Sequence, residues 1–86
     1  MNAQPSHATV AGRHGVFVTD AEHGLLWETA VLVTDLLDLI EACGTAHALE
    51  VRSDVGVFHA TARRWWVAPM GDEMLVRIEL ERTITA

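Results

Sequence analysis

Hydrophobic and polar residues follow two different periods along this chain. In the first half, apolar positions recur at the spacing of an α-helix, whereas in the second half they recur at every second position. The change of period falls near Gly44. The pattern therefore predicts one long helix followed by a group of strands.

The helix is predicted between Thr19 and Gly44. Thr19 and Glu22 have the spacing of a capping box, and Gly44 suits the position just after the last helical turn. At 100° per residue, one face of this helix is apolar and carries Leu25, Leu26, Leu32, Val33, Leu36, Leu37, Ile40 and Cys43. We expect this face to cover a sheet.

The strands of that sheet are predicted mainly in the second half. Residues 48–53 alternate with Leu49 and Val51 inward, and residues 74–84 alternate with Met74, Val76, Ile78, Leu80 and Ile84 inward. Pro69 and Gly71 predict a hairpin turn between a strand at 55–68 and the last strand. A second hairpin is predicted around Gly12, between residues 9–11 and 16–19.

Together these elements predict an α+β fold in the order β(β)-α-β-β-β. One long helix would pack on a small antiparallel sheet of three to four strands. We expect residues 9–86 to form this single domain and residues 1–8 to form a flexible tail. The length of 86 residues and the hydrophobic content of 50% agree with one small domain that has a well-filled core.

The run RRWW at positions 63–66 combines bases with aromatic residues. If alternation is unbroken through this strand, Trp66 faces the core and Trp65 lies on the opposite face. Trp65 would then lie near Arg77, and Arg63 near Glu79, across the neighbouring strand. The candidate residues of an oligomer or ligand face are therefore His59, Arg63, Trp65 and Arg77.

Acidic residues dominate the charge, which is −6 overall from 12 acids and 6 arginines. They are concentrated on the predicted helix, and Trp27 lies on its acidic side. A large aromatic residue with a charged rim is typical of a binding hot spot. The candidate partner-binding residues are therefore Trp27, Glu28, Val31, Asp35 and Asp38.

No motif in the sequence predicts catalysis or a cofactor. The five histidines lack the spacing of a metal site, and the single cysteine, Cys43, lies on the apolar face of the predicted helix, where a buried thiol is expected. We predict no catalytic residue, no metal site and no cofactor. An enzyme is the less favoured class of protein.

The pattern favours a small acidic protein-interaction module without enzymatic activity, an inhibitor or regulator whose acidic helix face docks on a basic surface of a partner. A homodimer is expected, because the open face of the sheet would expose Val57, Trp65, Val67 and Leu75.

Two alternatives remain open. One is a small ligand-binding or enzymatic domain, with its pocket near the sheet face or the dimer seam. The other is a single-stranded nucleic-acid binder that uses the Arg/Trp strand, which the negative net charge disfavours. The sequence contains neither a secretory signal nor an apolar run long enough for a membrane helix, so we expect a cytoplasmic protein without a membrane partner.

Overall fold

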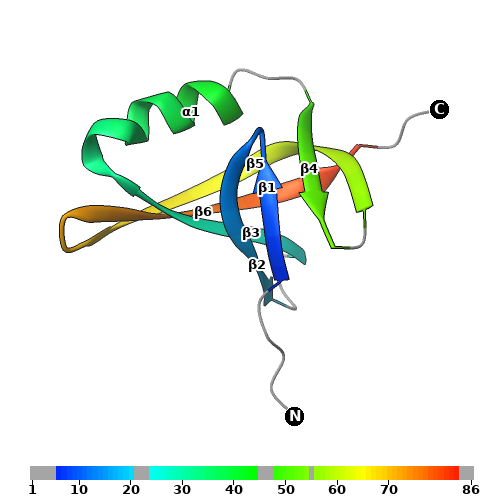
Figure 1. Cartoon of the computed structure of the whole chain (residues 1–86), viewed down its shortest axis with the longest axis horizontal. Helices are drawn as coiled ribbons and strands as arrows, with labels where there is room; N and C mark the ends of the chain where they lie inside the picture. The colour runs from blue at the N-terminus through cyan, green and yellow to red at the C-terminus, as the bar shows by residue number, and fades with distance from the viewer. Residues whose placement is uncertain (1–5, 21–23, 45–47, 55, 84–86) are drawn as a thin grey trace, which may run out of the picture.

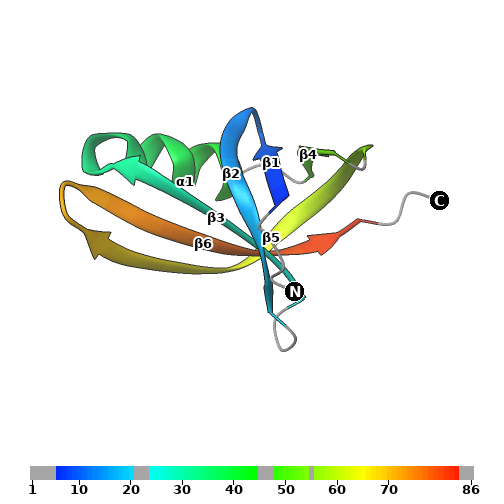
Figure 2. The same ribbon diagram turned by 60° about the horizontal axis from the view of Figure 1, so that its bottom comes forward.

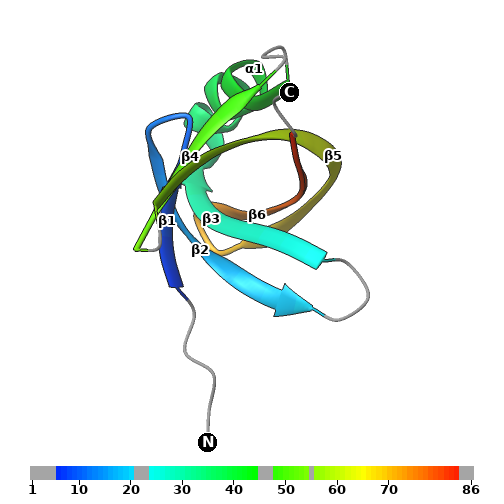
Figure 3. The same ribbon diagram turned by 90° about the vertical axis from the view of Figure 1, so that its right-hand side faces the viewer.

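Six antiparallel strands form a closed barrel in the computed structural model, which describes residues 6–20, 24–44, 48–54 and 56–83 (Figure 1). The strands are β1 (Ser6–Val10), β2 (Arg13–Asp20), β3 (Gly24–Leu32), β4 (Leu49–Ser53), β5 (Gly56–Met70) and β6 (Glu73–Arg82). A 3-10 turn, η1 (Val33–Asp35), and a short helix, α1 (Leu36–Gly44), connect β3 to β4. The order around the barrel is β1-β2-β3-β6-β5-β4, and β4 pairs back onto β1. Figure 3 shows the ring of strands end-on, with α1 beside it.

The prediction of an α+β fold, with one long helix on a sheet of three to four strands, is wrong. Residues 24–32 form strand β3, which leaves only Val33–Gly44 helical. β3 pairs with β2 on one side and with β6 on the other, where eight residue pairs run from Leu25↔Leu80 to Leu32↔Glu73. Two ladders of backbone hydrogen bonds outweigh the helix preference of the individual residues. The helix ends at Gly44 as predicted, and Glu22 of the predicted capping box lies outside the described residues.

Strand β3 was hidden from the periodicity because apolar residues lie on both of its faces: Leu26, Ala30 and Leu32 point outward, and Leu25, Trp27 and Val31 point inward. Trp27 faces the barrel interior and has no exposed surface, while its neighbour Leu26 points outward and is still only 3% exposed. A strand that carries apolar residues on both faces loses the alternation that marks a half-buried strand. Such a run of apolar residues cannot be distinguished from a helical segment by its period alone.

The barrel interior is filled by side chains from the strands and from α1. The largest fully buried side chains are Trp27, Leu39, Leu49, Ile78, Val10, Val51, Val76 and Cys43. The inward positions predicted for the strands at 48–53 and 74–84 are confirmed at Leu49, Val51, Val76, Ile78 and Leu80; Met74 is only partly buried and lies outside the core cluster, and Ile84 lies outside the described residues. The helix contributes Leu39 and Cys43, so it closes the core rather than covering an open sheet.

Two tight hairpins confirm the predicted turns. Ala11 and Gly12 both have a positive φ, of 52° and 79°, which is the pattern of a type I′ turn between β1 and β2. Gly71 has a φ of 64° and Asp72 does not share it, which is the pattern of a type II′ turn between β5 and β6. β1 begins at Ser6, so residues 6–8 belong to the barrel, and residues 1–5 lie outside the described residues.

The β5–β6 hairpin projects beyond the shorter strands of the barrel (Figures 1 and 2). β4 pairs with β5 only over the first five residues of β5, and β2 pairs with β3 only as far as Val16↔Glu28. The remaining parts of β3, β6 and β5 therefore form a three-stranded extension of the barrel wall. The RRWW run lies at the base of this extension.

Candidate functional site

A β-bulge in β5 decides which tryptophan faces the core. The register shifts between Ala62, which pairs with Leu80, and Arg64, which pairs with Glu79, so Arg63 is an extra residue in the strand. A bulge moves every later side chain to the other face of the sheet. The prediction that Trp66 faces the core and Trp65 the outside is therefore wrong: Trp65 packs against the core, and Trp66 is exposed.

Beyond the bulge, the outer face of the β3–β6–β5 sheet carries a group of mostly apolar side chains. The pairing places Trp66 beside Arg77, which pairs in turn with Glu28, and it places Ala68 beside Leu75 in the next row. Six residues on this face are called the Trp66 face below: Leu26, Trp66, Ala68, Met70, Leu75 and Arg77.

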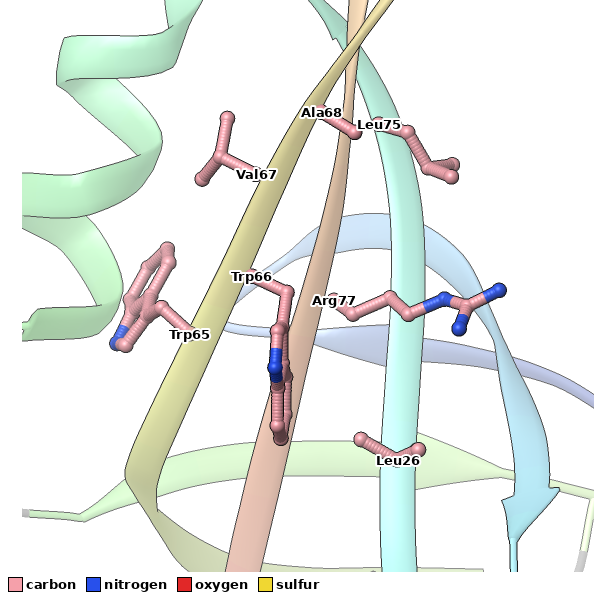
Figure 4. A pocket seen from close by; sticks show the side chains of 7 residues that line it. All are labelled: Leu26, Trp65, Trp66, Val67, Ala68, Leu75 and Arg77. Carbon is pink, nitrogen blue, oxygen red and sulfur yellow. The ribbon is translucent and has the colours of Figure 1, made fainter.

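The Trp66 face borders a pocket of about 690 Å³, lined by Leu26, Trp65, Trp66, Val67, Ala68, Leu75 and Arg77. In Figure 4, Trp66, Arg77 and Leu26 lie together on one side of the sheet, while Trp65 and Val67 lie on the other side of β5, toward α1. Trp66 is 36% exposed and Met70 is 44% exposed. Large apolar side chains are thus displayed on an open sheet face.

The charged groups around the Trp66 face compensate one another. Arg77 Nε donates a hydrogen bond of 2.6 Å to Glu28 Oε2, which neutralises the arginine nearest to Trp66. The Arg64 guanidinium carbon lies 5.9 Å from the centre of the Trp66 ring, a cation–π contact, and Glu79 is its partner across the strand pair. The face therefore combines apolar surface with a balanced, polar rim.

The five residues predicted to bind a partner do not share one surface. Trp27 lies in the core, and its indole nitrogen donates a hydrogen bond of 3.2 Å to the Ala8 carbonyl. Glu28 lies on the outer face of β3, and Val31 packs against the core. Asp35 and Asp38 are exposed on η1 and α1. The predicted acidic helix face with an exposed Trp27 does not exist, because half of that helix is strand β3.

The structure also separates the four residues predicted for an oligomer or ligand face. His59 lies in the part of β5 that pairs with β4, and Arg63 forms an ion pair of 3.1 Å with Glu81 instead of meeting Glu79. Trp65 pairs with Ile78 rather than with Arg77. Of these four residues, only Arg77 belongs to the Trp66 face. The other five residues of that face were not predicted from the sequence as site residues: Leu26, Trp66, Ala68, Met70 and Leu75. The adjacent Arg63 and Arg64 were the available signal, because regular alternation would turn one of these two charges toward the core.

Within the described ranges, no group of three or more histidine, cysteine, aspartate or glutamate side chains could hold a metal ion. His23 and His47 lie outside these ranges. No helix formed by the described residues is long and apolar enough to cross a membrane.

Cys43 is a buried thiol, 1% exposed, in the last turn of α1. Burial raises the pKa of this thiol, and the positive charge of Arg13 opposes the rise. An unfolded chain ionises its thiol at a pKa of about 8.5. As the pH rises past that value, the unfolded state therefore loses its proton before the folded state does, and the folded state loses stability.

The expected result is a free energy of unfolding that falls above about pH 8.5. In a Cys43→Ala variant this part of the decline should be absent. Urea titrations at several pH values would measure how the free energy of unfolding changes with pH in the wild type and in the variant. A thiol reagent should label wild-type Cys43 only as the chain unfolds. Rapid labelling of the folded protein at pH 8 would contradict the assignment.

The Trp66 face carries two of the exposed large apolar side chains of the described residues, Trp66 and Met70. Compared with known proteins, the chain matches no family model, no curated protein and no solved structure.

Proposed function

We propose that this protein is a non-enzymatic interaction module that binds a protein partner through the Trp66 face. The observation that supports this most is the exposure of Trp66 and Met70 on one face of an open sheet. Tryptophan is among the residues most enriched at the centres of protein interfaces. If the alternation of residues 56–62 continued along β5, Trp66 would face the core. The bulge at Arg63 turns this tryptophan outward instead.

The charges around the Trp66 face favour a protein partner over a nucleic acid. A nucleic-acid surface needs positive charge in excess, because phosphate contacts supply much of the affinity. Here Arg77 is bound to Glu28, and Arg64 lies opposite Glu79. An apolar centre with a balanced rim is the usual composition of a protein–protein interface.

A small-molecule ligand is the second candidate, because the adjoining pocket of about 690 Å³ has the size of a ligand site. Such sites place several polar groups around a ligand. Arg77 is the one charged residue among those that line this pocket, and it is already hydrogen-bonded to Glu28. Native mass spectrometry would detect a retained ligand, and a bound small molecule would favour this candidate.

Site-specific photo-crosslinking tests the protein-binding proposal. A photoreactive phenylalanine analogue replaces Trp66 in one variant and Arg52, an exposed residue of β4, in the control. Irradiation of cells that express each variant should give a discrete protein adduct from position 66 alone. A second change on the same face, Ala68→Glu, should abolish that adduct, because it places a charge in the apolar surface.

Equal adducts from both positions, or no adduct from position 66, would refute the proposal. The fold itself should survive these changes, because substitutions at exposed positions usually alter stability by less than about 0.5 kcal/mol. Circular dichroism spectra of each variant provide that check.

A further inference from the structure

We infer that this chain forms a homodimer in which the projecting end of β5 pairs antiparallel with the same segment of a second copy, centred on Val67. The inference builds on the proposed function by naming a second copy of the chain as the partner, which would pair along the edge of β5 and bring Ala68 of the partner subunit beside Trp66 on the Trp66 face. It would join two three-stranded extensions into one continuous six-stranded sheet, with both Trp66 side chains on the same face.

The projecting end of β5 is a sheet edge. β4 covers this strand only over Gly56–Ala60, so among the described strands residues 61–70 have a neighbour, β6, on one side only. All five residues from Trp66 to Met70 are exposed, and Val67 is 42% exposed. An uncharged, exposed edge strand is a ready template for pairing with another strand.

The hairpin geometry identifies the backbone groups that point away from β6. Met70 and Glu73 flank the two-residue turn, so they form a hydrogen-bonded pair, and the pattern alternates from there along β5. Trp65, Val67 and Pro69 are therefore in non-hydrogen-bonded positions relative to β6. The N–H and C=O groups of Trp65 and Val67 point to the free edge, and Pro69, which has no N–H, offers a carbonyl there.

The same edge is complementary to itself in charge. Its beginning carries two bases, Arg63, which forms an ion pair with Glu81, and Arg64, whose guanidinium lies over the Trp66 ring; its middle is uncharged, and its turn carries the acids Asp72 and Glu73. When two such strands pair antiparallel, the basic end of each meets the acidic turn of the other. This complementarity, present twice in a symmetric pair, is what selects a second copy as the partner.

Centring the pair on Val67 gives the best match of these ends. Val67 would lie opposite Val67 of the partner subunit and exchange two backbone hydrogen bonds with it. Arg64 would lie opposite the partner's Met70, beside the partner's Glu73. The Trp65 N–H would donate a hydrogen bond to the carbonyl of the partner's Pro69. The return bond to the Trp65 carbonyl would be missing, because proline has no N–H.

Sedimentation equilibrium of the full-length protein tests the dimer. The wild type is expected to show a dimer at micromolar concentrations, and Val67→Lys to weaken it by at least tenfold, because two lysines would face each other across the two-fold axis. The matched control is Val57→Lys, which changes an exposed residue in the part of β5 that β4 covers. A wild type that stays monomeric at 200 micromolar, or a control that weakens the dimer equally, would overturn the inference.

Charge reversal tests the role of the strand ends. Arg64→Glu is expected to weaken the dimer severalfold, because it places a carboxylate near Glu73 of the partner subunit. The double variant Arg64→Glu with Glu73→Arg restores opposite charges across the interface and should recover most of the affinity. A double variant that binds as weakly as the product of its single changes would refute the proposed pairing.

Disulfide formation tests the register. In a Cys43→Ala background, Val67→Cys should form a covalent dimer on mild oxidation, because the two residues lie directly opposite each other. Trp66→Cys should not, since each residue 66 would face residue 68, which leaves the two Cα atoms about 8 Å apart. Crosslinking through position 66 and not 67 would contradict the register and the charge argument together.

The two proposals fail in different ways. An adduct from position 66 with twice the mass of the chain supports both of them. Adducts with other proteins alone, together with a monomeric protein in sedimentation, would overturn the homodimer and leave the interaction module standing. A monomer that gives no adduct would refute both.

Discussion

Replacing Trp27 with alanine is expected to lower the free energy of unfolding by about 4 kcal/mol, within the range of about 3–5 kcal/mol for a buried tryptophan. The side chain has no exposed surface and is the largest of the fully buried side chains in the barrel. Its removal leaves a cavity and also leaves the Ala8 carbonyl without its indole donor, 3.2 Å away. Since a domain of this size has a total stability of about 4–13 kcal/mol, the variant is close to the limit of folding.

The milder variant Trp27→Phe keeps the measurement interpretable if the alanine variant does not fold. It removes the hydrogen bond and part of the ring, and it should cost about 2 kcal/mol. Urea unfolding followed by circular dichroism, at one fixed protein concentration, gives the free energies without relying on tryptophan fluorescence.

Trp66→Ala is the matched control for these variants, because Trp66 is exposed on the outer face. It should change the free energy of unfolding of the monomer by less than about 1 kcal/mol. If Trp66→Ala proved as costly as Trp27→Ala, the assignment of one tryptophan to the core and the other to the surface would be untenable.

Gly15→Ala is expected to be the most damaging of the small substitutions, with a loss of about 3 kcal/mol. A Cβ atom at this position would lie 2.5 Å from the Glu28 carbonyl oxygen and 2.5 Å from Cε2 of the Trp27 ring. Real Cβ atoms do not approach so closely, so β2 would have to move away from β3 or Trp27 would have to leave its position. Both movements disturb the centre of the barrel.

Gly44→Ala provides the control for Gly15→Ala, because the nearest atom to its added Cβ is Ile40 Cγ2, at an ordinary distance of 4.0 Å. Its effect on stability should be below about 1 kcal/mol. The double variant Gly15→Ala with Trp27→Phe should be less damaging than the sum of its parts, since the smaller ring frees space. If the two losses of unfolding free energy simply added, the Trp27 ring would not be the group that excludes a Cβ atom at position 15.

The Trp66 face and the stability of the barrel depend on the same local irregularity. The bulge at Arg63 brings Trp65 into contact with the core and sends Trp66 outward in one step. Because Arg63 is the unpaired residue, its removal would leave Trp65 opposite Ile78 and Trp66 opposite Arg77 while making the strand regular.

Much of the candidate site could not be predicted, for a physical reason that concerns single residues. The position of Trp66 depends on whether one residue, Arg63, is in register with β6, and a shift of one residue inverts every side chain after it. The hairpin turns were predictable because glycine at Gly12 and Gly71 relieves a backbone strain that is local to the turn. Register is a property of two strands together, so the adjacent charges of Arg63 and Arg64 could signal an irregularity in β5 without showing which residue is unpaired.

What the sequence by itself determined is therefore local: the two tight turns, the inward positions of Leu49, Val51, Val76, Ile78 and Leu80, the end of the helix at Gly44, and the acidic charge. Only the tertiary structure decided that residues 24–32 form a strand, that the sheet closes into a barrel, and that Trp27 fills it. These features arise from pairing partners that are far apart along the chain. A run such as Gly24–Leu32, which has apolar residues on both faces, has no period that selects helix or strand. It forms a strand here because β2 and β6 supply backbone hydrogen-bond partners on both of its sides.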